Sequence, residues 1–317
     1  MSGLPHDLAE AVRSLADDLG SRRGLAESAS AMSAHYRQRG ASSAVIGGSS
    51  DALAYALSRM PATYAAVSNV LEELARRAPE FAPASVLDAG AGPGTAAWAA
   101  AAAYPAATLT LMDHNRPFLD LASRLATPGS ATEYRHDDLG RFDLGRSFDL
   151  VTCAYALTEL PDTAMLDAAT RLWRHCSGAL VLVEPGRPRD YQRLMAVRAH
   201  LIGRGGAVLA PCPHERECPL VEPDWCHFSV RLARSRDHMR MKGGSLGYED
   251  EKFSYLVVAR PGIGTRAVAR VIKRPEENKF SVTLPLCAEP GLERRVVPSR
   301  DRPAFKAARK LDWGDAV

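Results

Sequence analysis

Short apolar runs alternate with helical stretches between Ser85 and Val183, and this alternation constrains the fold more than any other feature of the 317-residue chain. The expected strands cover residues 85–89, 108–112, 132–135, 148–153 and 178–183, and helices are expected near 90–104, 117–125 and 164–175. Strands that alternate with helices over short connections form a parallel sheet covered on both faces. The sequence therefore predicts an α/β fold.

Three regions are expected along the chain. Residues 1–80 are rich in Ala, Leu, Glu and Arg, which favours a helical N-terminal lobe. Residues 81–200 hold the predicted sheet. Residues 201–317 begin with a stretch rich in Gly, Pro, Cys, His and Arg, and strand signals return at 254–259, 266–272 and 279–286. We expect this third region to be a cysteine-rich, basic extension that carries the remaining strands.

The charge is divided unevenly between the two ends of the chain. Residues 227–317 carry 19 Lys and Arg against 11 Asp and Glu, whereas residues 1–226 carry 21 against 26. A basic end on a slightly acidic body suggests contact with a polyanion, and the alternative is a solvated basic surface.

No membrane-spanning helix is expected, because the sequence contains no run of about 18 apolar residues without a charged residue. Residues 1–20 contain four acidic residues and no apolar core. They resemble neither a secretory signal nor an Arg-rich transit peptide, so we expect a cytoplasmic location.

A glycine-rich segment, Val86–Thr95, joins the first predicted strand to the helix after it. Glycines let the backbone turn tightly and approach a ligand, and the helix presents free N–H groups at its start. Asp88 stands two residues before the first of three glycines spaced Gly-x-Gly-x-Gly, unlike the Gly-x-Gly-x-x-Gly of dinucleotide sites. Asp113 ends the next strand, where a carboxylate can accept both ribose hydroxyls. Asp137 and Asp138 follow the third strand, where an adenine edge would lie.

This arrangement resembles the class I S-adenosylmethionine-dependent methyltransferases, over roughly residues 81–184. The resemblance implies a Rossmann-like sheet with S-adenosylmethionine as its cofactor. The cofactor-binding residues that it implies are Asp88, Gly90, Gly92, Gly94, Asp113, Asp137 and Asp138. Asp88 and Gly90 would face the methionine part, Asp113 the ribose, and Asp137 or Asp138 the adenine. The alternatives are a loop that is glycine-rich for packing alone, or a site for NAD.

The sequence leaves methyl transfer open, and we assign no catalytic residue. Transfer from a sulfonium needs mainly an aligned nucleophile, so few protein groups are obligatory. The run Cys153–Leu160 lacks the Asn/Asp-Pro-Pro-aromatic pattern of many amino-methylating enzymes. Pro211-Cys212 matches the pair often used in carbon-5 pyrimidine methylation, but it falls outside the strand order expected for such an enzyme.

Three of the six cysteines, Cys212, Cys218 and Cys226, crowd into fifteen residues, and Cys287 stands alone further on. In a reducing compartment, thiols set among prolines suggest metal ligation rather than disulfides. Four thiolates suit either Zn²⁺ or an iron–sulfur cluster. The wide, irregular spacing fits the larger cluster better than a single ion.

Other residues compete with this interpretation. His214 and His227 lie within the same segment and are possible ligands. The alternative is that all the cysteines are ordinary buried residues, which is what we expect for Cys153 and Cys176 because they lie in apolar runs.

Taken together, the motifs resemble a narrower family, the methyltransferase-like assembly factors of the mitochondrial small ribosomal subunit and their bacterial relatives. The matching pieces are Tyr55–Tyr64, Val86–Thr95, Ala156–Leu160, Glu184–Gly186, Pro211–His227, Leu286-Cys287 and Lys310–Asp315. The resemblance implies a [4Fe–4S] cluster on Cys212, Cys218, Cys226 and Cys287. It also implies small-subunit rRNA as the partner, and we expect a monomer when the chain is on its own.

The leading hypothesis is therefore an S-adenosylmethionine-binding, methyltransferase-like protein that acts on or binds small-subunit rRNA in ribosome assembly. The alternatives are a small-molecule or protein methyltransferase with a structural zinc site, and a non-catalytic rRNA-binding factor. The basic residues expected to contact RNA phosphates are Arg231, Arg234, Arg236, Arg240, Lys242, Lys273, Arg274, Arg294, Arg295, Lys306, Arg309 and Lys310.

Overall fold

The computed structural model describes residues 3–18, 22–37, 46–127, 130–242 and 246–317. Within these residues the larger sheet has eight strands in the order β3-β2-β1-β4-β5-β8-β6, and β7 also pairs with β8. The strands are β1 (Ser85–Ala89), β2 (Thr108–Asp113), β3 (Thr132–His136), β4 (Phe148–Ala154), β5 (Cys176–Pro185), β6 (Ala207–Ala210), β7 (Phe228–Ala233) and β8 (Tyr248–Ala259). The expected α/β fold with a central parallel sheet is confirmed.

Strands β1 to β5 are parallel to their neighbours, and β8 runs antiparallel to β5. Strands β6 and β7 pair with successive parts of β8, also antiparallel. The larger sheet therefore continues past residue 200, where we expected a boundary, and the three-region division stays a prediction.

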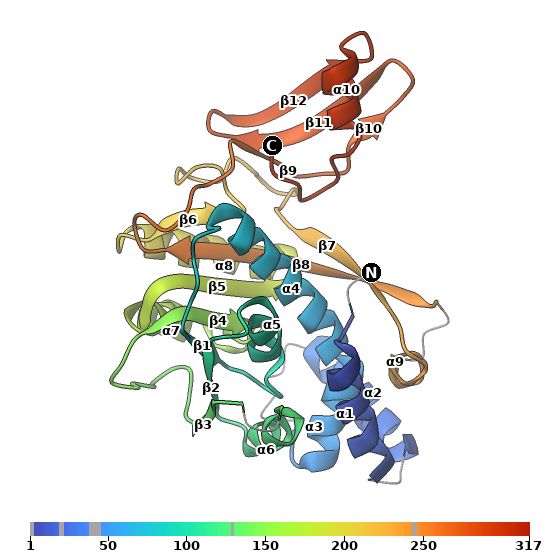
Figure 1. Ribbon diagram of the computed structural model, residues 1–317, viewed down its shortest axis with the longest axis vertical. Coiled ribbons are helices and arrows are strands. Elements are labelled where there is room, and N and C mark those ends of the chain that lie inside the picture. Colours follow the sequence, from blue (N-terminus) through green and yellow to red (C-terminus); the bar gives the residue numbers. More distant parts are fainter. Residues whose placement is uncertain (1–2, 19–21, 38–45, 128–129, 243–245) are drawn as a thin grey trace.

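Helices cover both faces of this sheet (Figure 1). On one face lie α4 (Met60–Arg77) and α5 (Thr95–Ala103), and on the other lie α7 (Asp162–Arg174) and α8 (Pro188–Ile202). Successive strand residues point to opposite faces. In β5, Val181 and Val183 join the core on the α4 side, whereas Leu180 and Leu182 join the core on the α8 side. This is why the strand reads as a continuous apolar run.

The remaining helices extend the fold at its ends. They are α1 (His6–Asp18), α2 (Arg22–Arg37), α3 (Ser49–Ser58), α6 (Arg116–Leu125), the short 3₁₀ turn η2 (Leu157–Glu159), α9 (Arg236–Lys242) and α10 (Arg302–Ala308). The first four helices match the expected helical N-terminal region, and α4 packs directly on β8 and β7. Across the described ranges, no helix is both long and apolar enough to span a membrane.

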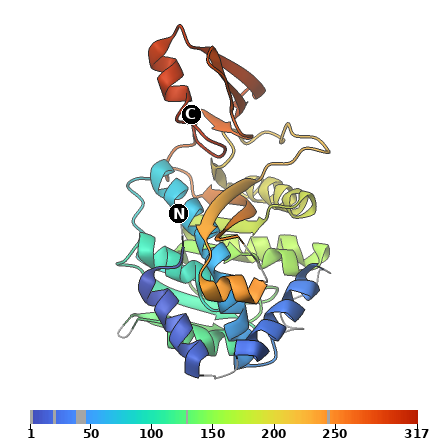
Figure 2. The ribbon, with the colours of Figure 1, turned by 90° about the vertical axis from the view of Figure 1, so that its right-hand side faces the viewer.

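A smaller sheet stands at one end of the molecule, away from α1–α3 at the other end (Figures 1 and 2). It contains β9 (Ala269–Val271), β10 (Glu276–Glu277), β11 (Ser281–Ala288) and β12 (Gly291–Pro298). Side chains from β11 and α10 share a separate small core. The C-terminus returns to this sheet, since the Val317 N–H donates to the Ala269 carbonyl oxygen at 2.9 Å.

Candidate cofactor and metal sites

The glycine-rich loop lies at the carboxyl edge of the parallel strands, where β1 leads into α5. Gly90, Gly92 and Gly94 have φ angles of 72°, 55° and 83°, a region that favours glycine. The N–H groups of Gly90 and Ala91 both donate to the Met112 carbonyl oxygen, at 2.8 and 3.0 Å. These bonds hold the loop against the end of β2.

A cavity opens beside this loop, and we call it the glycine-loop cavity. Four of the seven predicted cofactor-binding residues line it, namely Gly90, Gly92, Asp113 and Asp138. The other three, Asp88, Gly94 and Asp137, are not among its lining residues. The wall also includes Tyr155 and Glu159 from the run Cys153–Leu160, and Tyr55 and Phe118, which the sequence analysis did not single out. Tyr55 packs edge-on against Phe118, with 4.9 Å between ring centroids.

Asp113 combines a structural role with a place on the cavity wall. Its Oδ2 accepts a hydrogen bond from the Gly92 N–H at 2.7 Å, and its Oδ1 accepts one from the Asn115 N–H at 2.8 Å. Burial raises the pKa of this carboxyl. A carboxylate oxygen can accept more than one hydrogen bond, so both oxygens keep capacity for a ligand.

Asp88 lies beneath the loop and bonds to the protein itself. Its Oδ2 accepts from the Ala97 N–H and its Oδ1 from the Thr152 hydroxyl, both at 2.9 Å. Burial raises its pKa to about 7. Asp88 thus ties the start of α5 to β4, and its contact with the methionine part of a cofactor stays a prediction.

Gly94 and Asp137 also have structural surroundings. A Cβ on Gly94 would stand 2.7 Å from the Trp98 ring, so glycine is needed there for packing. Asp137 accepts from the Asp138 N–H at 2.8 Å. Of the acidic pair proposed for adenine, the structure places Asp138 on the cavity wall.

The loop after β4 is held by a buried carboxyl at the end of β5. Glu184 accepts hydrogen bonds from the Leu157 and Thr158 N–H groups, both at 3.1 Å. Burial raises the pKa of Glu184 well above its usual range. The sequence piece Glu184–Gly186 therefore shapes the cavity wall without lining the cavity.

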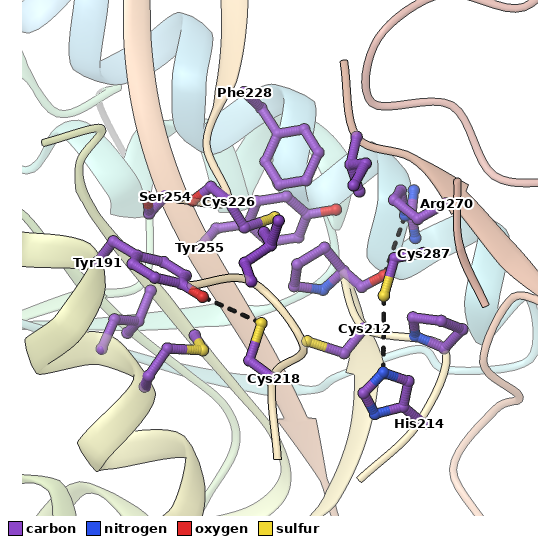
Figure 3. Close-up of a pocket in the computed structure, with 16 residues that line it drawn as sticks. Tyr191, Cys212, His214, Cys218, Cys226, Phe228, Ser254, Tyr255, Arg270 and Cys287 are labelled. Carbon is purple, nitrogen blue, oxygen red and sulfur yellow. Dashed lines mark hydrogen bonds between the residues drawn. The ribbon is translucent and has the colours of Figure 1, made fainter. Parts of the chain in front are cut away.

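The four predicted ligand cysteines meet in one pocket, which we call the cysteine pocket (Figure 3). Cys212, Cys218 and Cys226 come from the segment between β6 and β7, and Cys287 comes from β11 of the smaller sheet. All are free thiols. Burial raises the pKa of Cys226 well above its usual range, and the other three cysteines raise it further. The four groups are therefore near enough to interact electrostatically.

Polar side chains surround these thiols. The Tyr191 hydroxyl donates to the Cys218 Sγ at 3.0 Å, and His214 Nε2 lies 3.6 Å from the Cys287 Sγ. Burial raises the pKa of Cys212, whereas the nearby Arg198 lowers it. The pocket thus holds four thiols beside buried cations, with no carboxylate among its lining residues.

The donor set fits a thiolate-bound metal group, because Cys thiolates select zinc and iron–sulfur clusters. In the part of the chain that the structure describes, no three or more His, Cys, Asp or Glu side chains are placed to hold a single metal ion.

The other candidate ligands separate into two groups. His214 lines the cysteine pocket. His227 instead stacks on Trp225, with 4.7 Å between ring centroids, and is not a lining residue. Cys153 and Cys176 lie in the hydrophobic core beside α7 and α8, as expected.

Half of the basic residues expected to face RNA form ion pairs with acidic side chains. These are Arg231, Arg234, Lys273, Arg294, Arg295 and Arg309, which pair with Asp250, Glu249, Asp224, Glu276, Glu293 and Glu277. Arg236, Arg274, Lys306 and Lys310 form no ion pair with a described residue. The side chains of Arg240 and Lys242 lie outside what the structure describes.

Comparison with known proteins places the chain in a family. A family model described as "Mitochondrial small ribosomal subunit Rsm22" matches residues 49–317. The human "Ribosome assembly protein METTL17, mitochondrial" is 31% identical over 291 residues, which cover 84% of this chain and 62% of that protein. The Schizosaccharomyces pombe "Rsm22-cox11 tandem protein 2, mitochondrial" is 26% identical over 325 residues, covering 83% of this chain and 42% of that protein. The chain thus spans less than two thirds of these relatives.

Solved methyltransferase structures are similar to part of the chain at low sequence identity. The magnesium protoporphyrin IX methyltransferase ChlM from Synechocystis PCC 6803, with bound SAM, has a TM-score of 0.43 and 16% identity over 63% of this chain and 80% of that chain. The N-methyltransferase NodS from Bradyrhizobium japonicum WM9 has a TM-score of 0.42 and 16% identity over 61% of this chain and 85% of that chain.

One expectation is wrong on this comparison. The cytoplasmic location was inferred from the acidic residues and missing apolar core of residues 1–20, but the family description and the relatives named above are mitochondrial. The composition of residues 1–20 was therefore not a reliable guide to the location of the family. The chain belongs to the Rsm22 family of the mitochondrial small ribosomal subunit.

Proposed function

We propose that this chain binds S-adenosylmethionine in the glycine-loop cavity, holds a [4Fe–4S] cluster in the cysteine pocket, and binds small-subunit rRNA during ribosome assembly. The observation that carries the proposal is the meeting of Cys212, Cys218, Cys226 and Cys287 in one pocket of an Rsm22-family chain. The name of the human relative, a mitochondrial ribosome assembly protein, supports the assembly role.

Cofactor binding is supported by the geometry of the glycine loop. A Cβ on Gly92 would have its nearest neighbour, Phe118, at 4.0 Å, so the loop backbone is open to the cavity at this point. Asp113 supplies acceptor oxygens for ribose hydroxyls, and the Phe118 ring offers an apolar surface for adenine. These residues would bind and orient the cofactor.

Cluster binding is supported by the four thiols that meet in the cysteine pocket. When bound, a cluster supplies iron–thiolate bonds, and on this chain these would join the segment between β6 and β7 to β11. Tyr191 would then donate its hydroxyl hydrogen bond to the sulfur of one ligand, Cys218. Hydrogen bonds to ligand sulfurs and burial are the means by which proteins tune such groups.

The test is metal and sulfide analysis of chain purified without oxygen. We expect iron and acid-labile sulfide in the wild type, and loss of both in Cys226→Ala. Cys153→Ala is the matched control, because Cys153 is a buried cysteine outside the pocket. Stoichiometric zinc without iron would contradict the cluster and favour the structural-zinc alternative.

RNA binding is tested by co-sedimentation with small-subunit precursors at several salt concentrations. We expect the triple variant Arg274→Ala/Lys306→Ala/Lys310→Ala to bind less tightly and to show a salt dependence lower by about one unit of slope per lost phosphate contact. The control removes three ion-paired arginines of the same region, Arg231, Arg294 and Arg309. Equal losses in both triple variants would show that general charge, not these contacts, governs binding.

A further inference from the structure

An aromatic side chain is exposed at one end of the smaller sheet, which lies at the top of Figure 1. Phe280 lies between β10 and β11, and 67% of its surface is exposed. Cys287 stands seven positions further along β11, so at about 3.4 Å per residue the cysteine pocket is about 24 Å away. We call this end of the sheet, residues 276–280 and 298–302, the sheet tip.

The backbone of Phe280 is fixed although its ring is exposed. The Asn278 side-chain oxygen accepts hydrogen bonds from the N–H groups of Phe280 at 2.8 Å and Ser281 at 3.0 Å. On the other side, the Phe280 carbonyl oxygen accepts one from the Ser299 N–H at 2.7 Å. A single exposed apolar side chain is ordinary on a protein surface. What distinguishes this ring is its rigid support together with the charges beside it.

Three exposed cations lie beside the segments that hold this ring. The Lys279 ammonium nitrogen is 4.8 Å from the Phe280 ring centroid. Arg300 is next in sequence to the residue whose N–H bonds Phe280, and Arg302 begins α10. None of the three cations forms an ion pair with a residue that the structure describes. Lys306, which is also unpaired, lies one helical turn beyond Arg302 and on the same face of α10.

The carboxylates of the sheet tip are engaged by neighbours. Glu276 pairs with Arg294 at 3.2 Å, and Glu277 pairs with Arg309 at 2.5 Å. The carboxylate of Asp301 caps the start of α10. With the two paired arginines included, five cations stand against three carboxylates. The sheet tip therefore keeps a surplus of positive charge after each of its carboxylates is counted.

We propose that the sheet tip binds single-stranded RNA, with one base stacked on Phe280 and the flanking phosphates on Lys279, Arg300 and Arg302. This proposal rests on the proposed rRNA partner and names the surface that would hold the RNA. Proteins hold single strands by stacking bases on aromatic side chains beside positive charge. Membrane binding scales with buried apolar area, and among the described residues of the sheet tip only Phe280 is a large exposed apolar residue. One ring suits one base better than a lipid surface.

The probe is a fluorescently labelled, unstructured RNA oligonucleotide of about ten nucleotides, titrated into full-length chain. A stable abasic oligomer with the same number of phosphates is titrated in parallel. We expect wild-type chain to bind the RNA at least about fivefold more tightly than the abasic oligomer, because only a base can stack on the ring.

Four variants separate stacking from charge. Phe280→Ala should weaken RNA binding by at least about fivefold and leave the salt dependence unchanged, whereas Phe280→Tyr keeps an aromatic face and should stay within about twofold of wild type. Arg300→Ala/Arg302→Ala should lower the salt dependence by about 1.4 units of slope. Leu292→Ala is the matched control, because Leu292 is 51% exposed near the other end of the same sheet.

Three results would overturn the sheet-tip assignment. One is a wild-type affinity for the RNA no higher than for the abasic oligomer, and another is unchanged RNA binding by Phe280→Ala. The third is Phe280-dependent binding to anionic phospholipid vesicles that is tighter than RNA binding, which makes a membrane the occupant.

Failure of the proposed function looks different from failure of the sheet-tip assignment. A wild-type chain that does not co-sediment with small-subunit precursors overturns the proposed function. If the wild type co-sediments and Phe280→Ala co-sediments equally well, the sheet-tip assignment alone is overturned.

Discussion

The glycine turn on the wall of the glycine-loop cavity comes from one contiguous segment, Val86–Thr95, whereas the cysteine pocket takes its thiols from the segment between β6 and β7 and from a different sheet. Cys287 lies 73 positions beyond His214, its neighbour in the pocket. The first site depends on local backbone conformation. The second depends on how distant parts of the chain pack together.

Arg270 shows how the cysteine pocket is assembled. Its guanidinium donates to the carbonyl oxygens of Pro211 at 3.0 Å and Gly314 at 2.9 Å, and to the Glu73 carboxylate at 2.6 Å. These partners lie 59, 44 and 197 positions away along the chain. One buried side chain therefore connects the N-terminal helix α4, the cysteine segment and the C-terminal region.

Among the substitutions considered for the two sites, replacement of Arg270 should cause the largest loss of stability. We expect Arg270→Met to lower the free energy of unfolding by about 3–5 kcal/mol, because Glu73 loses its buried partner and two carbonyl oxygens lose a donor. Urea unfolding measures this loss. The control is Arg231→Met, which breaks an exposed ion pair and should cost less than about 1 kcal/mol. Equal costs for the two variants would contradict a central role for Arg270.

Two glycine substitutions test the glycine loop. Gly94→Ala should lower the free energy of unfolding by about 2–4 kcal/mol, since it combines a left-handed φ of 83° with a Cβ 2.7 Å from Trp98. Gly92→Ala has φ 55° but no neighbour closer than 4.0 Å, so its cost should be nearer about 1–2 kcal/mol.

The same pair separates stability from binding. The Cβ of Gly92→Ala enters the open side of the loop, so this variant should lose more affinity for S-adenosylhomocysteine than stability alone explains. Calorimetric titration at a temperature where both variants are folded checks this. If Gly92→Ala binds as well as the wild type, the glycine-loop cavity is not the cofactor site.

A further prediction concerns the pH dependence of stability at Asp88. Burial raises its pKa in the folded chain from the ordinary 3.8 to about 7. Between these values the folded chain binds more protons at this site than the unfolded chain, so the contribution of Asp88 to stability falls as pH rises through this range. Asp88→Asn removes that dependence. The free energy of unfolding of the variant, relative to wild type, should therefore rise from pH 4 to pH 7.

Urea unfolding at a series of pH values measures this difference. Asp143→Asn is the control, because the Gly145 N–H holds the pKa of this exposed carboxyl below its ordinary value. Its difference from wild type should change below about pH 4 and in the opposite sense. Parallel stability curves for Asp88→Asn and wild type would show that the Asp88 carboxyl is not perturbed.

Strands β1, β2, β4 and β5 could be predicted because each is mainly an apolar run bounded by turn residues, and apolar side chains on both faces are what a doubly covered strand requires. Strand β7 carried a signal that the sequence analysis missed. Phe228, Val230 and Leu232 are buried and alternate with polar or exposed residues, the period expected of a half-buried strand. Helix α8 was harder to predict from the sequence, because the buried residues Arg193 and Arg198 interrupt its apolar face.

The cavity walls could be predicted in part. Gly90, Gly92, Asp113 and Asp138 belong to motifs at strand ends, and they line the glycine-loop cavity. Tyr55 also lines the glycine-loop cavity, but the sequence around Tyr55 does not indicate where helix α3 packs. Asp88 belongs to the same motif yet is buried beneath the loop, because its carboxylate is needed to hold α5 and β4.

Side-chain periodicity and glycine spacing are properties of neighbouring residues, so they were sufficient to predict the parallel sheet and the tight glycine turns. The meeting of Cys287 with the other three cysteines and the three contacts of Arg270 are visible only in the folded chain. These contacts join residues far apart in the chain. They depend on how the two sheets and α4 pack, which no local pattern encodes.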